Sequence, residues 1–260
     1  MLKQRTLSAL VFAPLVTGAF FLGRGVFLGF ILLTGAFCAW EYRNMMAGVS
    51  IELSPIFIPL CMAIAVSGVS NRLDYFIASI IGGSLILLAT SIKQGTLASV
   101  FGVSGAVYIG GLLGCLGLLR VQPDGREWCF VVLFVTWAND MGAYFGGRAF
   151  GKRKLAPTIS PGKSWEGACF GLGAGVLTGA CLSSWTGFAV AEGAVVGALL
   201  AVMAQVGDLV ESKLKRYCQV KDSGKAIPGH GGFLDRFDSL LFTGAGGLLI
   251  KSICGLLLYP

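Results

Sequence analysis

Charge is scarce in this sequence. Only 13% of its 260 residues are Asp, Glu, Lys or Arg, whereas 55% are hydrophobic. Because a soluble globular domain carries about 25% charged residues, this composition excludes a soluble protein and leaves no length for a large separate soluble domain. The 39 glycines suit closely packed membrane helices. We therefore predict an all-α fold, that of a polytopic integral membrane protein.

The patterns of several common sites are also missing. The eight cysteines are scattered, mostly within apolar runs, and none forms a CxxC pair, so we expect neither a zinc site nor a disulfide framework. Gly162-Lys163-Ser164 resembles the end of a Walker A motif. However, Pro157 stands where that motif needs a glycine, and no strand is expected before it. A P-loop nucleoside triphosphatase is therefore excluded.

Apolar stretches long enough to cross a bilayer, roughly 17–25 residues each, recur along the whole chain. There are nine, at residues 7–23, 25–41, 52–70, 73–92, 97–119, 128–147, 166–188, 190–208 and 237–258. The first follows basic residues but lacks a small-residue cleavage site, so we expect it to be retained rather than removed as a signal peptide. We predict about nine transmembrane helices.

Lys and Arg residues fall mostly on one side of this topology. With the N-terminus on that side, fifteen lie there and four lie opposite. Because cytoplasmic loops carry the excess of Lys and Arg, we predict a cytoplasmic N-terminus and cytoplasmic loops 148–165 and 209–236 in the inner (plasma) membrane. We divide the chain into N-terminal transmembrane helices, residues 1–120, and a catalytic transmembrane region, residues 121–260. The net charge of +7 is then expected to meet anionic lipid headgroups and an anionic substrate rather than nucleic acid.

Glycines recur at four-residue spacing in two of the predicted helices. They are Gly167, Gly171, Gly175 and Gly179 in one helix and Gly193 and Gly197 in the next. Residues at this spacing share one helix face, where glycine lets two backbones approach closely. We expect these faces to pack helices together.

The densest charge lies at residues 208–238, where five carboxylates and six Lys or Arg residues are flanked by apolar stretches. Asp208 ends one stretch, with Glu211 one helical turn further on, and Asp235 and Asp238 repeat that spacing at the start of the last stretch. Such carboxylates predict a Mg²⁺ site, because Mg²⁺ is held by a few carboxylates together with waters and substrate phosphates. The alternative is that these acids only pair with neighbouring Lys and Arg side chains.

Two further groups of residues have the chemistry of a phosphate site. Residues 228–232 form a turn-forming run whose glycines permit positive torsions and whose amides can cradle phosphate oxygens. Asp140 lies inside an apolar run, where an ionisable group is a functional candidate. The loop that follows is basic, and its cations can attract a nucleotide or lipid phosphate. The alternative for this loop is an orientation signal that contacts anionic lipid.

Residues 212–238 read Ser212-x-Leu-Lys-Arg-x4-Lys221-Asp222-x-Gly224-x2-Ile227-Pro228-x-His230-Gly-Gly-Phe-x-Asp235-Arg236-Phe-Asp238. This pattern resembles, position by position, the signature of the phosphatidate cytidylyltransferases (CDP-diacylglycerol synthases). The segments around Asp140 and at residues 160–167 are similar to those of the bacterial enzymes. The specific resemblance covers about 60 residues.

The resemblance implies an enzyme of phospholipid biosynthesis that transfers the cytidylyl group of CTP to phosphatidate, giving CDP-diacylglycerol and pyrophosphate. It also implies a Mg²⁺-dependent site facing the cytoplasm, with one or two metal ions, and often a homodimer. The expected catalytic residues are Asp208, Lys221, Asp222, Asp235 and Asp238. The expected metal ligands are Asp208, Asp235 and Asp238. The expected substrate-binding residues are Ser212, Lys215, Arg216, His230, Gly231, Gly232, Arg236, Asp140, Arg148, Lys152, Ser160 and Lys163.

Three alternatives stay open at this point. A transporter or channel also contains intramembrane carboxylates and glycine-broken helices, although here the charges gather at one face and no inverted repeat is apparent. A CTP-using kinase of a polyisoprenoid alcohol would release CDP rather than pyrophosphate. An inactive scaffold is disfavoured by the intact set of acidic residues.

Overall fold

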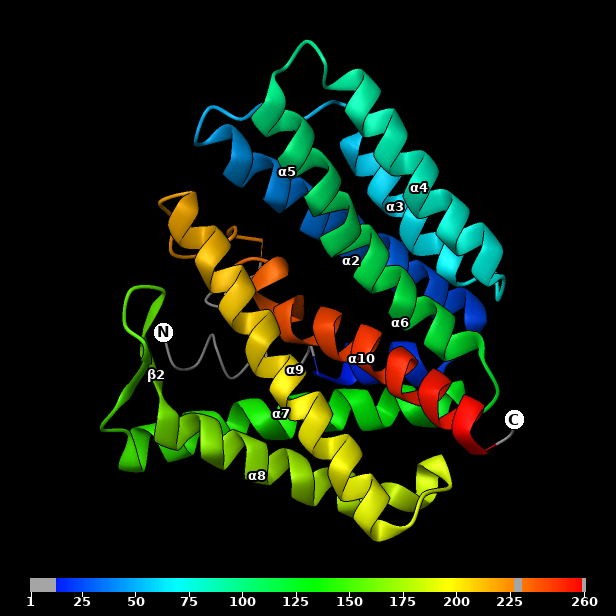
Figure 1. Cartoon of the computed structure of the whole chain (residues 1–260), viewed down its shortest axis with the longest axis vertical. Helices are drawn as coiled ribbons and strands as arrows, with labels where there is room; N and C mark the ends of the chain where they lie inside the picture. The colour runs from blue at the N-terminus through cyan, green and yellow to red at the C-terminus, as the bar shows by residue number, and fades with distance from the viewer. Residues whose placement is uncertain (1–12, 227–230, 259–260) are drawn as a thin grey trace. The chain divides into compact units, whose positions relative to one another are not determined.

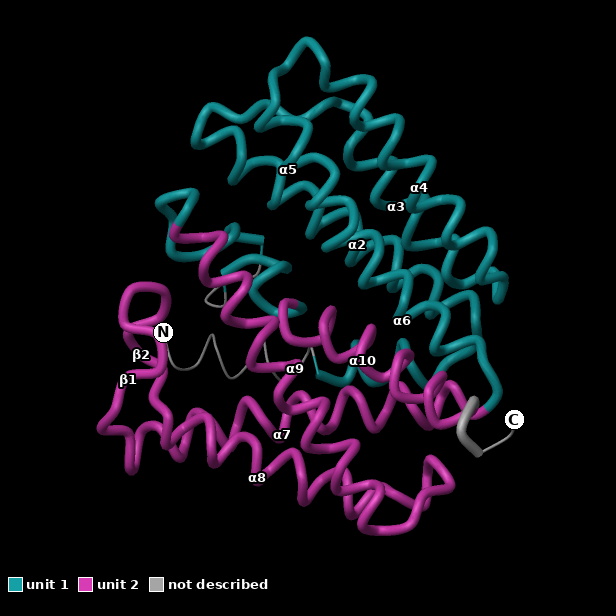
Figure 2. Tube along the Cα trace, in the orientation of Figure 1, with its two compact units in different colours: residues 1–123, 217–237 teal, residues 124–216, 238–260 magenta. Residues whose placement is uncertain are grey.

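The computed structural model describes residues 13–226 and 231–258, which form helices and one short hairpin. The chain divides into two compact units, residues 1–123 with 217–237 (unit 1) and residues 124–216 with 238–260 (unit 2), drawn in different colours in Figure 2. The elements are α2 (Arg24–Ala47), α3 (Phe57–Gly68), α4 (Leu73–Thr90), α5 (Thr96–Ala106), η1 (Val107–Gly111), α6 (Leu112–Val121), α7 (Gly125–Phe150), β1 (Lys154–Ala156), β2 (Ser160–Ser164), α8 (Trp165–Cys181), η2 (Ser183–Thr186), α9 (Val190–Tyr217) and α10 (Leu234–Leu258).

Unit 1 is built around α3, which packs against α2, α4 and α6. Close approach is possible because glycines face one another: a Cβ at Gly68 would collide with the backbone of Gly114, and one at Gly110 would lie 2.7 Å from the carbonyl oxygen of Cys61. α5, η1 and α6 form one continuous apolar helix, residues 96–121. Residues 217–237 of the signature, from the last residue of α9 to Phe237, also belong to this unit and are called the signature segment below.

The helices of unit 2 pack closely through faces lined by glycine. α7 and α8 pack side by side along their lengths (Figure 1), and a Cβ at Gly142 would lie 2.9 Å from the carbonyl oxygen of Phe170. The next contact joins α8 to α9, where a Cβ at Gly179 would lie 2.6 Å from the Cα of Gly197. These contacts confirm the helix-packing role predicted from the four-residue glycine spacing.

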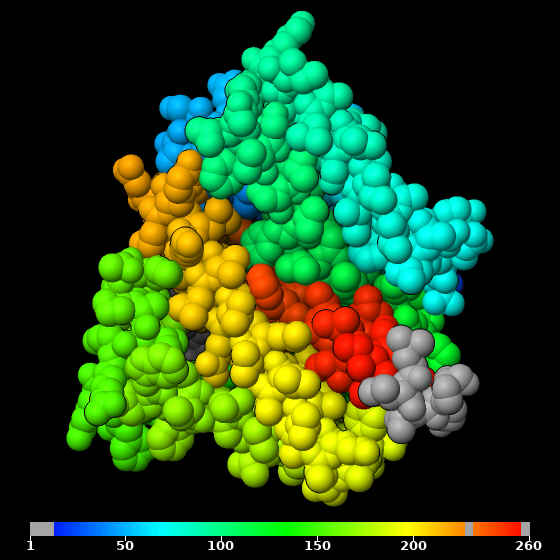
Figure 3. Space-filling view, viewed as in Figure 1, coloured from blue at the N-terminus to red at the C-terminus, as the bar shows by residue number. Residues whose placement is uncertain are grey.

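α9 and α10 continue the packing of unit 2. Figure 3 shows their side chains in contact, yellow against red. A Cβ at Gly207 of α9 would lie 2.7 Å from the carbonyl oxygen of Asp238, and the side chain of Met203 lies against Gly246 of α10. Thr136 of α7 and Thr243 of α10 also approach within 2.9 Å through their hydroxyl groups. The carboxylate-bearing end of α9 is therefore fixed against Asp238.

Six helices of the described residues are long and apolar enough to span a membrane, which identifies an integral membrane protein. The prediction of nine spans is not confirmed, because α3 has 12 residues, α8 has 17 and the first predicted stretch lies partly outside the described residues. α3 is short because Pro55 and Pro59 lack backbone N–H groups, and proline is tolerated only in a first turn. The helix therefore begins at Phe57.

The two predicted cytoplasmic loops contain regular structure that hydropathy did not indicate. α9 continues to Tyr217, so the first nine residues of the predicted loop 209–236 are helical. The loop 148–165 contains the antiparallel pair β1–β2, which joins Lys154 to Ser164 and Ala156 to Ser160. The all-α prediction is therefore correct for the spanning part and misses this hairpin.

Candidate functional site

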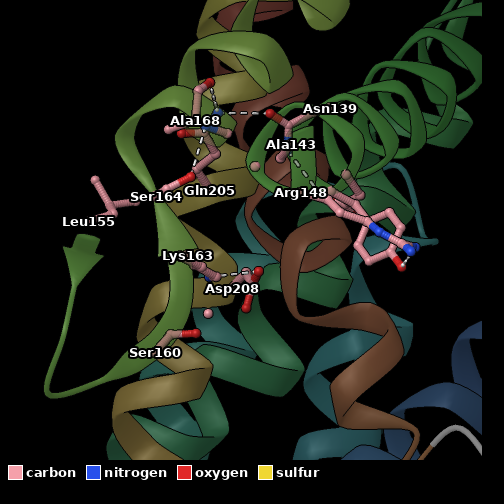
Figure 4. Close-up of a pocket in the computed structure, with 15 residues that line it drawn as sticks. Asn139, Ala143, Arg148, Leu155, Ser160, Lys163, Ser164, Ala168, Gln205 and Asp208 are labelled. Atoms are coloured by element: carbon pink, nitrogen blue, oxygen red, sulfur yellow. Dashed lines mark hydrogen bonds and ion pairs between the residues drawn. The ribbon is translucent and has the colours of Figure 1, made fainter. Parts of the chain in front are cut away.

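A cavity of about 500 Å³ lies within unit 2, between α7, α9 and the hairpin. Its lining includes several of the predicted site residues, together with Asn139, Tyr144 and Gln205. Those predicted residues are Asp140, Arg148, Ser160, Lys163 and Asp208. Two cations, two acids and hydroxyl and amide groups thus converge on one pocket, shown in Figure 4.

The Lys163–Asp208 ion pair is the centre of this pocket. The Lys163 ammonium lies 2.6 Å from Asp208 Oδ2, and the two side chains point toward each other in Figure 4. Ser212, one turn further along α9, donates a hydrogen bond of 3.3 Å to Asp208 Oδ1. Both side chains of the ion pair keep partial exposure. An anionic ligand can therefore reach the ammonium, and a cation can reach the carboxylate.

The hairpin that carries Lys163 is anchored at its end and near its tip. Ser164 caps α8 by accepting a hydrogen bond from the Gly167 N–H at 3.1 Å. Glu166, in the first turn of α8, accepts from the backbone N–H groups of Lys152 and Arg153 at 3.0 and 3.2 Å. Arg216 of α9 donates to the Ile159 carbonyl oxygen at 3.1 Å. These contacts fix Lys163 relative to α9.

An amide network orients the acid on the α7 side of the pocket. Gln205 of α9 donates to Asn139 Oδ1 at 2.9 Å and to the Ala168 carbonyl oxygen at 3.0 Å. The Asn139 amide then donates to Asp140 Oδ1 at 3.1 Å. Sequence reasoning found Asp140 but missed Asn139 and Gln205, which carry no charge. A polar side chain inside an apolar run is the signal that would have found them.

Asp238 is buried in unit 2 and interacts electrostatically with Asp208, Glu211 and Asp140. Two of these acids are paired with lysines: the buried Glu211 forms an ion pair with Lys215, and Asp208 forms one with Lys163. Gathering carboxylates in an apolar interior is costly unless a cation neutralises them. Among the described residues, no three His, Cys, Asp or Glu side chains form a metal-binding group. Mg²⁺ commonly uses only one or two carboxylates plus waters and phosphates, and the Asp208 and Asp238 pair fits that requirement.

The signature segment is organised within unit 1. Asp235 Oδ2 accepts hydrogen bonds from the Ser223 N–H at 2.9 Å and the Gly232 N–H at 2.8 Å, and it lies 3.0 Å from the Ser223 hydroxyl, whose one proton is shared with Glu41. Gly231 has a φ of +85°, in the region that favours glycine. The positive torsion predicted for the glycine run is thus present at Gly231, whereas residues 228–230 of that run lie outside the described residues. In this geometry one Asp235 oxygen orders its own loop.

Glu41 of α2 is a site residue that the sequence reasoning missed. Its carboxylate is 1% exposed and accepts from the N–H groups of Phe233 and Leu234, each at 2.9 Å, and from the Ser223 hydroxyl at 3.0 Å. It therefore meets the signature segment more than 180 residues away in the chain. Glu41 could have been identified from the sequence in the same way as Asp140, because it is an acidic residue inside a predicted membrane span.

The remaining predicted residues are not among those that line the pocket, or they lie outside the described ranges. Lys221, Asp222 and Arg236 are exposed on unit 1, and Lys152 is exposed before β1 in unit 2. The pocket of unit 2 does not include Lys152 among its described lining residues. His230 lies outside the described residues, so its role stays a prediction. The joint use of Asp235 with Asp208 and Asp238 also stays a prediction from the sequence.

Comparison with known proteins gives a consistent family. The model of the cytidylyltransferase family matches residues 3–253. A phosphatidate cytidylyltransferase of Pseudomonas aeruginosa is 37% identical over 263 aligned residues, covering 92% of this chain and 93% of the relative. One of Brucella suis is 34% identical over 250, covering 94% and 91%, and one of Staphylococcus haemolyticus is 32% identical over 254, covering 93% and 96%.

The matched region includes both the pocket of unit 2 and the signature segment of unit 1. Because the matching family consists of enzymes, the comparisons do not favour a transporter or channel. With the family model covering almost the whole sequence, the chain is a membrane-embedded enzyme of the cytidylyltransferase family.

Proposed function

We propose that this protein is a phosphatidate cytidylyltransferase: it transfers the cytidylyl group of CTP to phosphatidate and releases pyrophosphate. The names of its full-length relatives support the substrates. The structural observation that carries the proposal is the pocket of unit 2, which is lined by Lys163, Arg148, Asp208 and Asp140, with Lys163 paired to Asp208. Cations for phosphate oxygens beside carboxylates for a metal ion are the parts that phosphoryl-type transfer requires.

In the proposed reaction a phosphatidate oxygen attacks the α-phosphorus of CTP in line. The new P–O bond forms as the bond from the α-phosphorus to the bridging oxygen breaks, and pyrophosphate leaves with its electron pair. The phosphate monoester is already anionic near neutral pH, so the step needs no strong general base. Positioning and charge neutralisation therefore dominate catalysis.

Different residues of the pocket bind different parts of the substrates. Lys163 exchanges its contact with Asp208 for an anionic phosphate oxygen, and Arg148, held near Tyr144, offers a second cation. Ser160 supplies a hydroxyl at the same wall. Lys221, Asp222 and Arg236 of unit 1 are assigned to the nucleotide phosphates or the metal by the sequence pattern alone.

Asp208 and Asp238 are the residues of unit 2 that would hold Mg²⁺, and Asp235 is a third ligand by sequence resemblance only. A bound Mg²⁺ supplies charge neutralisation at the reacting phosphate and the leaving group. Asp208 lines the pocket, whereas Asp238 is buried and is not among the lining residues. The two carboxylates therefore have different duties, Asp208 at the substrate and Asp238 as the inner support.

We also propose that the enzyme spans the inner membrane nine times with its N-terminus and active site in the cytoplasm, and that it forms a homodimer. The excess of Lys and Arg on one side of the topology supports the orientation. CTP is a cytoplasmic solute, whereas phosphatidate enters from the bilayer. Reporter fusions at the termini and in residues 148–165 test the topology: the N-terminus and residues 148–165 are expected on the cytoplasmic side, and the C-terminus, after nine spans, on the opposite side.

The decisive experiment measures pyrophosphate release by detergent-purified protein given CTP, Mg²⁺ and phosphatidate, with each component omitted in turn. We expect release only when all three are present, a CDP-lipid in the organic phase, and loss of both after chelation with recovery on adding Mg²⁺. Release of CDP with a phosphorylated lipid would instead identify the kinase. Folded protein that binds CTP but yields neither product would refute the proposed activity.

A further inference from the structure

Glu41 occupies an unusual position for an acid in an apolar helix. It lies on α2 within a membrane-spanning candidate, and its carboxylate is buried against the signature segment of the same unit. Phe233 donates to Oε1, while Leu234 and Ser223 donate to Oε2. Every contact is 2.9–3.0 Å, within the ordinary range of hydrogen bonds.

The donors explain why a carboxylate is stable there. The N–H groups of Phe233 and Leu234 belong to the start of α10, where backbone donors have no partner inside the helix. The positive end of the helix dipole lies at the same place. Glu41 thus acts as a cap supplied by a distant helix, and both of its oxygens are used.

Two glycines of the signature are shaped around this carboxylate. A Cβ at Gly224 would lie 2.7 Å from the Glu41 carboxyl carbon, and a Cβ at Gly232 would meet the same carbon at 2.7 Å. Backbone must therefore lie directly on the Glu41 side chain from both flanks of the segment. Glycine is therefore required at these two positions because a larger side chain would collide with Glu41, which lies far away in the sequence.

Ser223 connects Glu41 to Asp235. Its hydroxyl lies 3.0 Å from Glu41 Oε2 and 3.0 Å from Asp235 Oδ2, and its oxygen also accepts from the Asp235 N–H at 3.3 Å. Asp235 is in turn held by the Ser223 and Gly232 N–H groups. A change at Glu41 therefore reaches Asp235 through one shared hydroxyl and through the first turn of α10.

We infer that Glu41 is a positioning residue for the cytidylyltransfer reaction: it holds both flanks of the signature segment and thereby sets the orientation of Asp235. This inference rests on the proposed function. Glu41 itself touches no reacting atom; it acts through Ser223 and the backbone of Phe233 and Leu234. Its loss changes turnover more than substrate binding, because the groups it places are needed in the transition state.

The substitution Glu41→Gln tests this with little change in size. Glutamine has one acceptor oxygen, so either Phe233 or the pair Leu234 and Ser223 faces an NH₂ group instead of an acceptor. We expect kcat per folded molecule to fall about 10- to 100-fold, the range for groups that orient ligating side chains, with KM for phosphatidate within about threefold. The matched control is Glu52→Gln, the same chemical change at an exposed acid of unit 1, with unchanged kcat.

Hydrogen exchange gives a second readout independent of activity. In Glu41→Gln we expect faster exchange at the backbone amides of residues 231–236, with the rest of unit 1 unchanged. Equal exchange at these amides would overturn the inference, as would a kcat within twofold of wild type. A purely structural role would reduce the yield of folded protein while leaving kcat per folded molecule unchanged, and that result also overturns it.

Ser223→Ala provides the same test if Glu41→Gln does not fold. It removes the shared hydroxyl and is expected to lower kcat and loosen the same amides, and unchanged values would refute the coupling. When both variants fold, the double variant should lose less than the product of the single losses. If wild-type protein forms no CDP-lipid, the proposed function fails, and the exchange measurements alone then decide the role of Glu41.

Discussion

Replacing Lys163 by methionine separates the stability of the pocket from its chemistry. The ammonium lies 2.6 Å from Asp208 Oδ2, and the side chains are 24% and 38% exposed. A pair this accessible to solvent is worth about 0.2–1 kcal/mol in folding free energy. A hydrogen bond from an ammonium to a substrate phosphate is worth about 1.5–3 kcal/mol. At 1.36 kcal/mol for each factor of ten, we expect kcat/KM to fall about 10- to 150-fold.

The assay compares Lys163→Met with Lys93→Met, which removes an exposed lysine from the turn between α4 and α5. Both variants are expected to unfold in detergent close to wild type, because neither loses more than about 1 kcal/mol. Only Lys163→Met is expected to lose activity. The reasoning would be refuted if Lys163→Met kept kcat/KM within threefold of wild type. It would equally fail if the free energy of unfolding fell by several kcal/mol, since the ion pair would then be a structural element.

Three further predictions concern packing and the acidic residues. Gly179→Ala places a Cβ 2.6 Å from the Cα of Gly197 and should lower the free energy of unfolding by about 1–3 kcal/mol. Gly173→Ala on the same helix meets nothing within 4 Å and should raise it by about 0.5–1 kcal/mol, so the two variants should shift the unfolding midpoint in opposite directions. Asp238→Asn should abolish turnover, because an amide is a poor ligand for Mg²⁺, and should not lower stability, because the residue is buried beside the like-charged Asp208 and Glu211. Thermal unfolding and a turnover assay check this, and retained activity would exclude the metal role. Gln205→Leu should reduce kcat through the loss of its bonds to Asn139 and Ala168, and wild-type turnover in that variant would show that Asp140 needs no such support.

The sequence was sufficient for the parts of the molecule that depend on local pattern. Apolar stretches located the helices, and the spacing of Gly175, Gly179 and Gly197 identified the faces that pack. Asp208 and Asp140 were recognised because charge in an apolar setting is costly, and Lys163 because cations of a basic loop can attract a phosphate; all three line one pocket. These features follow from composition and period, which a single sequence displays.

Hydropathy did not predict the end of a helix correctly where the helix continues into charged residues. The end of α9 is rich in Glu, Lys and Arg, residues that form helices well, so the helix continues to Tyr217 after the apolar stretch has ended. The β1–β2 hairpin depends on side chains of other elements, Glu166 of α8 and Arg216 of α9. Glu41 was missed for the same reason, since its partners lie at the other end of the chain.

Because Glu41 contacts the signature segment, the N-terminal half of the chain also contributes to the site. We assigned residues 121–260 to catalysis and residues 1–120 to membrane helices, yet the first half supplies the carboxylate around which Gly224 and Gly232 fold. A gene fragment encoding only the second half would carry every signature residue and still lack that anion. Activity from split halves should therefore require complementation, with co-expression of a fragment that contains α2.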